Sequence, residues 1–373
     1  MDPVGGRKID RGPAGDGCPV RRGPDGTWRV TGYEQARTVL RSGGTVQAGL
    51  GIETVEKLPA RFRRPVLYRD GPEHREHRRQ TARFFTPRRV SEHYRDIMVR
   101  VAGEQLARLT RTGRADLPDL AFGLAIGVAA EVIGLTESRP GIQRRLDRFF
   151  PEKFGRPGFT SLTGIHWFFR QMRNWLAVYL ADVRPAVRAR RRDRRDDLIS
   201  HLLDEGCTAG EILGECLTFA AAGMVTTREF VSVAAWHLFT DDDLRTRYRA
   251  AGEDERIALL HEILRTEPVI GGLKRRTTEP LRLDGDTIPA GELVELRIDA
   301  ANLEPCEPPG LSFGDGAHKC PGAHIAILET DVFLSRLFAL PGLRMATPPR
   351  VTRKAEIDSY ELRNLVVTTS APD

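Results

Sequence analysis

A short glycine-rich stretch near the C-terminus, L-S-F-G-D-G-A-H-K-C-P-G at Leu311–Gly322, constrains this chain more than any other part of its sequence. Gly314 and Gly316 permit positive φ angles and a close approach of the backbone, and Gly322 leaves space where a helix is expected to start. Cys320 therefore lies where backbone amides and a helix dipole favour a negatively charged sulfur. The pattern predicts a loop that presents one thiolate to a large, flat metal cofactor.

Helical periodicity dominates the rest of the chain, so a mainly α fold with minor β structure is expected. Strands are predicted only in short pieces, at Thr27–Val30, Leu281–Ile288, Glu292–Leu296 and Leu365–Thr368. Helices are predicted at Arg75–Phe85, Ile97–Thr110, Ile165–Ala189, Ala209–Thr240 and Glu255–Thr266. The regular alternation of strand and helix in a Rossmann domain is absent, which argues against a nicotinamide dehydrogenase.

No shift in composition divides the 373 residues into two parts, and a 40% hydrophobic content suffices for a large core. We expect one helical domain over residues 25–373, preceded by a flexible segment over residues 1–24. The longest apolar run, Leu120–Ala130, is shorter than the roughly 20 residues that span a bilayer. Five cysteines without metal-finger spacing indicate a reducing compartment. A cytoplasmic protein without a membrane partner is therefore predicted.

Positive charge is concentrated in an arginine-rich segment at residues 184–195, and the formal net charge is +6. Asp193 interrupts this segment, Asp196 and Asp197 follow it directly, and no aromatic residue is interleaved for base stacking. We therefore favour a solvated helix end over a nucleic-acid-binding surface and expect no nucleic-acid partner. An acidic redox protein is a third interpretation, because basic patches steer acidic proteins.

The predicted central helix contains A-A-G-M-V-T-T at Ala221–Thr227, where its side chains become small. Ala222, Gly223 and Thr226 share one helix face. A glycine in a helix costs about 1 kcal/mol relative to alanine, so it calls for a compensating function. A notch for a flat ligand or dioxygen is one explanation. Close packing of two helices, with the threonine bonded to a carbonyl, explains the residues equally well.

The cysteine loop resembles the heme-binding loop of the cytochrome P450 family, F-x-x-G-x-H-x-C-x-G, and fills each of its fixed positions. The resemblance implies that Cys320 is the axial ligand of heme b iron. It also implies that Phe313, Gly314 and Gly322 belong to the cofactor-binding loop, and that His318 donates to a heme propionate.

Two further matches imply the remaining propionate donors. The stretch D-G-P-E-H-R-E-H-R-R at Asp70–Arg79 is close to the family's P-x-H-x-x-x-R, which assigns His74 and Arg78 to this role. Arg275 matches a donor further along the chain. His74 and Arg78 lie four residues apart on one helix face, so both can reach one anionic group.

The central helix resembles the family's A-G-x-[DE]-T, which implies catalytic roles for Ala222, Gly223 and Thr226, with the threonine hydroxyl assisting oxygen activation. Val225 stands where the family has an acid. That acid relays protons to oxygen. Its replacement by valine therefore indicates either that water delivers the protons or that the reaction needs less proton delivery.

The resemblance extends over about Asp70 to Leu340 in the family's order. Glu262 and Arg265 fit its E-x-x-R, which implies a buried structural ion pair that supports the heme loop. Between Asn302 and Leu311 the chain is much shorter than the meander of bacterial members, and it lacks the arginine that completes the E-x-x-R network.

The resemblance implies a heme-thiolate monooxygenase that oxidises a medium-sized organic molecule, and its association with soluble bacterial members implies a role in natural-product biosynthesis. Without a flavin or nicotinamide motif, it implies ferredoxin and ferredoxin reductase as electron donors. Its pocket would be bordered by residues 51–68, the small-residue helix face with Phe219, residues 269–273 and the turn near Tyr360. Two alternatives stay open: oxidative coupling or peroxide- or nitric-oxide-dependent oxidation, and a non-catalytic heme- or ligand-binding protein.

Overall fold

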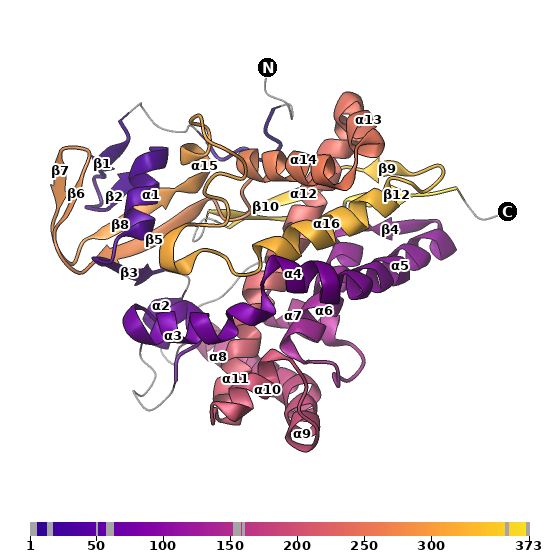
Figure 1. Cartoon of the computed structure of the whole chain (residues 1–373), viewed down its shortest axis with the longest axis horizontal. Coiled ribbons are helices and arrows are strands. Elements are labelled where there is room, and N and C mark those ends of the chain that lie inside the picture. Colours follow the sequence, from indigo (N-terminus) through magenta and orange to yellow (C-terminus); the bar gives the residue numbers. More distant parts are fainter. Residues whose placement is uncertain are drawn as a thin grey trace.

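The computed structural model describes residues 6–12, 18–49, 51–56, 63–151, 158, 161–354 and 358–370. Helices make up most of these residues and the sheets are small, which confirms the predicted mainly α fold. In Figure 1 the largest sheet lies on one side, the helices fill the other, and the central helix runs through the middle of the molecule.

The longer helices are α1 Tyr33–Arg41, α3 Gly71–Thr81, α5 Arg95–Thr112, α6 Leu117–Ile133, α7 Ile142–Phe149, α8 Leu162–Val178, α9 Arg184–Arg192, α10 Leu198–Asp204, α11 Ala209–Phe219, α12 Thr226–Thr240, α13 Asp242–Ala250, α14 Glu253–Thr266 and α16 Ala323–Leu337. Shorter helical segments are α2 Ile52–Val55, η1 Val66–Tyr68, η2 Ala82–Phe84, α4 Pro87–Arg89, η3 Val90–Tyr94, α15 Ile298–Ala301 and η6 Gly316–His318.

Two of the predicted long helices contain a π-helical turn. The central helix is interrupted by η5 Ala220–Val225, between α11 and α12. Between α8 and α9 lies η4 Tyr179–Val183, which ends two residues before Pro185. Proline has no backbone N–H to donate, so a local change of hydrogen-bonding register is favoured there. Both segments nevertheless continue as helices over the predicted ranges.

The largest sheet has the order β1-β2-β8-β5-β3, with β1 Val20–Arg22, β2 Trp28–Val30, β3 Thr45–Ala48, β5 Gly272–Thr277 and β8 Leu293–Arg297. Strands β2 and β8 pair in parallel, and the other pairs are antiparallel. Strand β5 was not predicted, because K-R-R at its centre hides any apolar alternation. Pairing with β8 and β3 on its two sides makes it a strand.

The remaining strands form three small sheets: β6 Leu281–Leu283 with β7 Asp286–Ile288; β4 Arg114–Asp116, β12 Val366–Thr368 and β9 Arg344–Thr347; and β10 Arg350–Lys354 with β11 Ser359–Arg363. The predicted hairpin at Leu281–Ile288 is confirmed. Its turn residues Asp284 and Gly285 have φ angles of 53° and 86°, as the tight turn of a two-residue hairpin requires.

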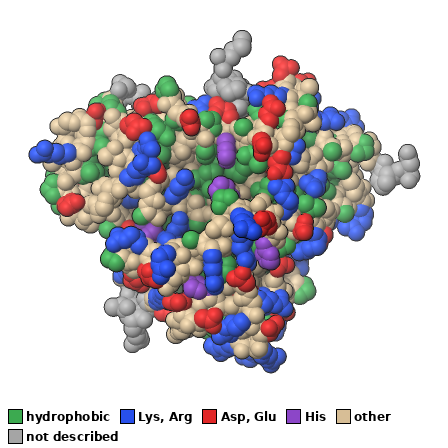
Figure 2. Space-filling view, in the orientation of Figure 1, with side chains coloured by type: hydrophobic (Ala, Val, Ile, Leu, Met, Phe, Trp, Pro, Cys, Tyr) green, Lys and Arg blue, Asp and Glu red, His purple; other side chains and the backbone are tan. Residues whose placement is uncertain are grey.

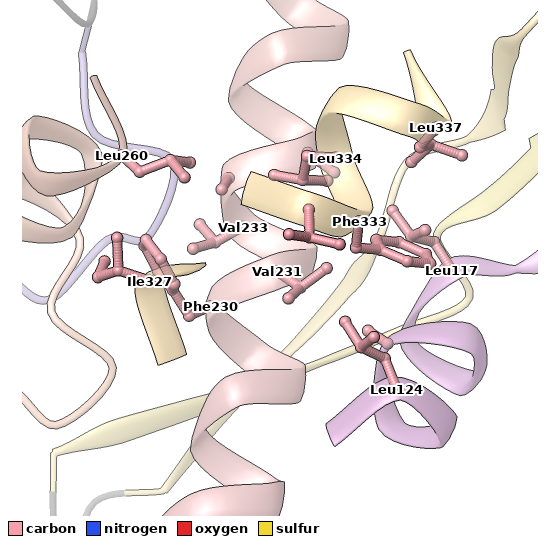
Figure 3. Close-up of a cluster of buried hydrophobic side chains, with 14 of the residues drawn as sticks. Leu117, Leu124, Phe230, Val231, Val233, Leu260, Ile327, Phe333, Leu334 and Leu337 are labelled. Atoms are coloured by element: carbon pink, nitrogen blue, oxygen red, sulfur yellow. The ribbon is translucent and has the colours of Figure 1, made fainter. Parts of the chain in front are cut away.

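The main core is built around α12. Figure 3 shows Val231 of α12 facing side chains of α16 and α6, and Phe230 of α12 beside Ile327 of α16. Phe333 of α16 and Leu124 of α6 are each 0% exposed. Burial of each such side chain stabilises the fold by roughly 1.5–3 kcal/mol. The core thus holds the helix that follows the cysteine loop against the central helix.

Part of the expected flexible segment, namely residues 1–5 and 13–17, lies outside the described residues. Within its described part, Ile9 is 2% exposed in the main core, and Val20–Arg22 forms β1. No helix among the described residues is long and apolar enough to cross a membrane.

The arginine-rich segment is partly internal. Arg190 is 1% exposed and pairs with Asp197, and Arg194 pairs with Asp204 at 2.8 Å. On the face shown in Figure 2, acidic and basic side chains are interspersed, and Lys and Arg gather at the lower end of the view, where Figure 1 shows α9.

Candidate functional site

Cys320 lies in a tight loop directly before α16, which begins after Gly322 as predicted. The Cys320 backbone N–H donates to the carbonyl oxygen of Phe313 at 2.8 Å, which closes the loop. Gly314 and Gly316 have φ angles of 67° and 66°, a region that side chains rarely adopt. A Cβ on Gly316 would also fall on the backbone carbonyl of Leu40 in α1. Both predicted glycine functions are therefore present.

Two groups favour a negative charge on the half-buried Cys320 sulfur. The backbone N–H of Gly322 donates to it, and the guanidinium of Arg78 supplies positive charge. Burial is the larger effect and raises the pKa of the thiol above its ordinary value. An amide donor and a nearby cation are the surroundings in which a cysteine serves as a thiolate ligand.

Three predicted propionate donors meet beside this loop. His318 Nε2 lies 2.9 Å from Asp70 Oδ1, and the His74 and His318 rings stack with their centroids 4.0 Å apart. Arg78 Nη2 donates to the carbonyl oxygen of Lys319 at 2.6 Å. The start of α3 is thereby joined to the residues directly before the cysteine.

The fourth donor, Arg275, is linked to Asp70 by way of the neighbouring strand β3. Strand β5 places it opposite Gln47, whose backbone N–H donates to Asp70 Oδ2 at 3.1 Å. Arg275 is 5% exposed, and its Nη1 donates to the carbonyl oxygen of Lys274 at 2.8 Å. No carboxylate among the described residues forms an ion pair with it.

Burial lowers the pKa of Arg275 to about 10, and the negative charge of Asp70 partly opposes that shift. A buried guanidinium is costly without a partner charge. His74 is 2% exposed, and burial, then the charges of His318 and Arg78, lower its pKa to about 4. The donor set therefore offers the buried guanidinium of Arg275 and the neutral imidazole of His74, which fits the carboxylates of heme.

The small-residue face of the central helix is open. Ala222 and Gly223 are exposed, whereas Ala220 and Met224 in the same turn are 3% and 0% exposed. A Cβ added to Gly223 would meet no atom within 4 Å. The Thr226 hydroxyl donates to the carbonyl oxygen of Ala222 at 2.6 Å. Space beside this face argues for the notch and against close helix packing there.

Glu262 and Arg265 form the predicted bidentate ion pair, with contacts of 2.6 and 2.9 Å. Arg265 Nη1 also donates to the carbonyl oxygen of Asn302 at 2.6 Å. The Asn302 side chain donates to the Arg265 carbonyl at 3.1 Å and to Ser312 Oγ at 2.8 Å, and it accepts from the Leu311 N–H at 2.8 Å. The ion pair is thus tied to the cysteine loop across the shortened connection.

Two residues of this site were not predicted to have a role. Asp70 was identified only as part of a motif. An aspartate directly before a helix that starts with Gly-Pro is a recognisable signal of a helix N-terminus. Asn302 carried no signal beyond its position before the loop. Of the predicted pocket borders, residues 57–62 lie outside the described residues.

Solved structures of bacterial cytochromes P450 have the same fold. The structure of CalO2 has a TM-score of 0.78 at 22% identity and covers 94% of this chain and 93% of its own. P450BioI, solved in complex with an acyl carrier protein carrying hexadec-9Z-enoic acid, has a TM-score of 0.77 at 22% identity and covers 94% and 95%. The fold is that of this class of heme proteins.

Curated relatives extend the likeness to the sequence. Erythromycin C-12 hydroxylase of Saccharopolyspora erythraea is 30% identical over 364 residues, which cover 86% of this chain and 83% of the relative. Mycinamicin IV hydroxylase/epoxidase of Micromonospora griseorubida is 28% identical over 353 residues, covering 88% and 86%. No protein-family model matches the chain. The chain belongs to the cytochrome P450 family, whose members are monooxygenases with a cysteine thiolate on heme iron.

Proposed function

We propose that this cytochrome P450 hydroxylates a medium-sized organic molecule of bacterial natural-product biosynthesis, with Cys320 as the iron ligand. One observation carries the assignment of residues: the Cys320 loop, the stacked His74–His318 pair and Arg78 meet in one place. The substrate class is supported by the macrolide names of two relatives, erythromycin C-12 hydroxylase and mycinamicin IV hydroxylase/epoxidase.

The residues divide into three roles in this proposal. His74, Arg78, Arg275 and His318 hold the heme propionates, while Phe313, Gly314 and Gly322 shape the loop around the cofactor. Heme held by the Cys320 thiolate would supply the activation of dioxygen for the oxidation of C–H bonds.

Ala222 and Gly223 leave space for substrate and dioxygen, because neither fills the open face of the central helix. The Thr226 hydroxyl donates its own proton to the Ala222 carbonyl, so its lone pairs are free to accept a hydrogen bond from a water molecule in that space. Thr226 thereby orients a proton donor without being one in this hydrogen-bonding state.

Ferredoxin and ferredoxin reductase supply the electrons in this proposal, and the protein works in the cytoplasm. A small-molecule substrate and a redox partner are the general requirement of bacterial members of the family.

A second candidate reaction is favoured by Val225. This half-buried valine ends η5, where the family has the acid that delivers protons. Oxidative coupling, or an oxidation driven by peroxide or nitric oxide, makes less use of that acid. A Val225→Asp variant with unchanged products and faster ferredoxin-driven turnover would argue against this candidate.

The test begins with the dithionite-reduced protein under carbon monoxide, with Cys320→Ala and Cys306→Ala beside it. A strongly red-shifted Soret band that is lost only in Cys320→Ala supports the assignment. Turnover of erythromycin-type macrolides with a surrogate ferredoxin, its reductase and NADPH then tests hydroxylation. Product formed only with hydrogen peroxide supports the second candidate, and a thiolate band without any turnover supports a non-catalytic heme protein.

A further inference from the structure

The N-terminal residues 6–12 join two segments that are far apart in the sequence. One segment follows α14, at Pro268–Gly271, and the other is the turn that enters β11, at Asp358–Tyr360. These segments also touch each other, because the Gly271 N–H donates to the Asp358 carbonyl at 3.0 Å and Ile270 forms a β-bridge with Ser359. The resemblance to cytochromes P450 implies that both segments border the substrate pocket.

Arg11 lies between the two segments and binds both. Its side chain is 2% exposed, with Nη2 donating to the Pro268 carbonyl and Nη1 to the Asp358 carbonyl. Arg11 Nη1 also lies 3.7 Å from Asp358 Oδ2, and its guanidinium carbon lies 5.3 Å from the centroid of the Tyr360 ring. A Cβ on Gly271 would fall on this guanidinium, so the glycine makes room for it.

The residues just before Arg11 fix the segment in place. The Ile9 side chain is 2% exposed, and its N–H donates to Glu267 Oε1 at 3.2 Å. The Lys8 N–H donates to the same oxygen. Glu267 is 0% exposed, and a buried carboxylate depends on such donors. The N-terminal segment is therefore bound to the domain interior at several points.

The β10–β11 hairpin has a second, independent anchor on α12. The Leu362 N–H donates to Glu229 Oε2 at 2.7 Å, and Arg363 Nη1 lies 3.0 Å from Glu229 Oε1. This anchor is on the central helix, three residues beyond Thr226. Loss of Arg11 would therefore loosen the turn at Asp358–Tyr360, which keeps its backbone contacts with Ile270 and Gly271, while the rest of the hairpin stays attached.

We propose that Arg11 is a positioning residue that fixes the distance between Pro268–Gly271 and Asp358–Tyr360, and thereby the shape of the substrate pocket. The inference rests on the proposed function, since a cytochrome P450 fold that oxidises a substrate is expected to have both segments beside the substrate pocket. Arginine is required because a planar guanidinium donates to two carbonyls and stacks on a ring at once, whereas lysine offers one compact charge. Arg11 selects among large ligands without taking part in heme binding.

The test uses the full-length, heme-loaded protein and the variants Arg11→Ala and Arg11→Lys. Arg22→Ala is the matched control, because Arg22 is an N-terminal arginine in a largely exposed ion pair with Glu292 at 3.1 Å. Two iron-binding probes are titrated by their Soret shifts: imidazole, which is small, and clotrimazole, which fills much of a pocket. Hydrogen exchange is measured on peptides that cover residues 268–273 and 358–363.

We expect the clotrimazole dissociation constant to change by about fivefold or more in both Arg11 variants, since a loss of about 1 kcal/mol corresponds to a factor of about five. The imidazole dissociation constant should stay within about twofold of the wild-type value. Exchange should accelerate in both peptides and stay unchanged in Arg22→Ala. Arg11→Lys keeps the positive charge beside Asp358. Its probe affinities and exchange rates therefore test the inference even if Arg11→Ala loads heme poorly.

Unchanged clotrimazole affinity together with unchanged exchange in Arg11→Lys would overturn the inference, as would equal effects in Arg22→Ala. Failure of the proposed function is recognised separately, by absence of the thiolate Soret band in the wild-type protein. In that case faster exchange in both peptides still supports Arg11 as the residue that joins the two segments, and unchanged exchange overturns it.

Discussion

Replacement of Asn302 by alanine tests whether this one side chain supports the cysteine loop across the shortened connection. Asn302 is 0% exposed, and its amide makes three hydrogen bonds, to the Arg265 carbonyl, Ser312 Oγ and the Leu311 N–H. In Asn302→Ala the Arg265 carbonyl and the Leu311 N–H lose these partners, while Ser312 Oγ still donates to the Leu264 carbonyl at 2.8 Å.

The expected loss follows from these two backbone groups. An unpaired buried polar group costs about 1–3 kcal/mol, so two cost about 4 kcal/mol, and local relaxation reduces the loss to about 3 kcal/mol. An unfolding entropy of about 2.1 cal/mol/K per residue gives roughly 0.8 kcal/mol/K for a chain of this length. The apparent Tm of Asn302→Ala should therefore fall by about 4 °C.

The assay is thermal unfolding followed by circular dichroism, with the carbon monoxide spectrum recorded on the same samples. Asn174→Ala is the control, because Asn174 is 6% exposed and its amide makes one hydrogen bond, to the Arg148 carbonyl at 2.8 Å. Its loss should be about 1 kcal/mol, or roughly 1 °C, with the thiolate band intact. If Asn302→Ala loses no more Tm than this control and keeps its full thiolate band, the reasoning about Asn302 is refuted.

Three further predictions concern the heme site and the buried histidine beside it. Gly316→Ala should abolish heme loading, because Gly316 has a φ of 66° and its new Cβ would clash with α1. Gly322→Ala should keep a folded domain, because no atom lies within 4 Å of its new Cβ. Equal heme content in the two variants would contradict this prediction. Arg275→Ala should leave the Tm of the apoprotein unchanged or raised, because the substitution removes a buried cation that has no ion-pair partner among the described residues. The heme-loaded variant should nevertheless release heme to apomyoglobin about tenfold faster than the wild type. Arg276→Ala is the control, because Arg276 is exposed. His77 is 1% exposed, and burial, then Arg69, lower its pKa to about 3, so His77 alone should lower the free energy of unfolding by about 1.4 kcal/mol per pH unit as pH drops from 6.5 towards 3. Urea unfolding of His77→Leu at pH 6.5 and 5 should show a slope that is shallower than the wild-type slope by this amount, because His74 still contributes. Parallel pH profiles would contradict this prediction.

The local sequence is sufficient to predict the cysteine loop and most helices. Residue type alone permits the positive φ angles at Gly314 and Gly316, and the loop pattern predicts the start of α16 after Gly322. Helical periodicity is likewise a property of neighbouring residues, so the central helix is predicted over almost its whole length. Its π turn is not predicted, since a change of hydrogen-bonding register leaves no mark in the spacing of apolar residues.

Pairings between distant segments are decided by the tertiary structure. Strand β5 is a run of basic residues that becomes a strand only between β8 and β3, and that placement turns Arg275 into a buried cation near Asp70. Asn302 and Arg11 act through carbonyl groups that any residue could provide. A residue's type determines its own φ preference and charge, but a hydrogen bond to a distant backbone group exists only once the chain has folded. For that reason the sequence alone determined the class of protein and indicated Cys320 as its proposed ligand, whereas the tertiary structure decided what supports the cysteine loop and what joins Pro268–Gly271 to Asp358–Tyr360.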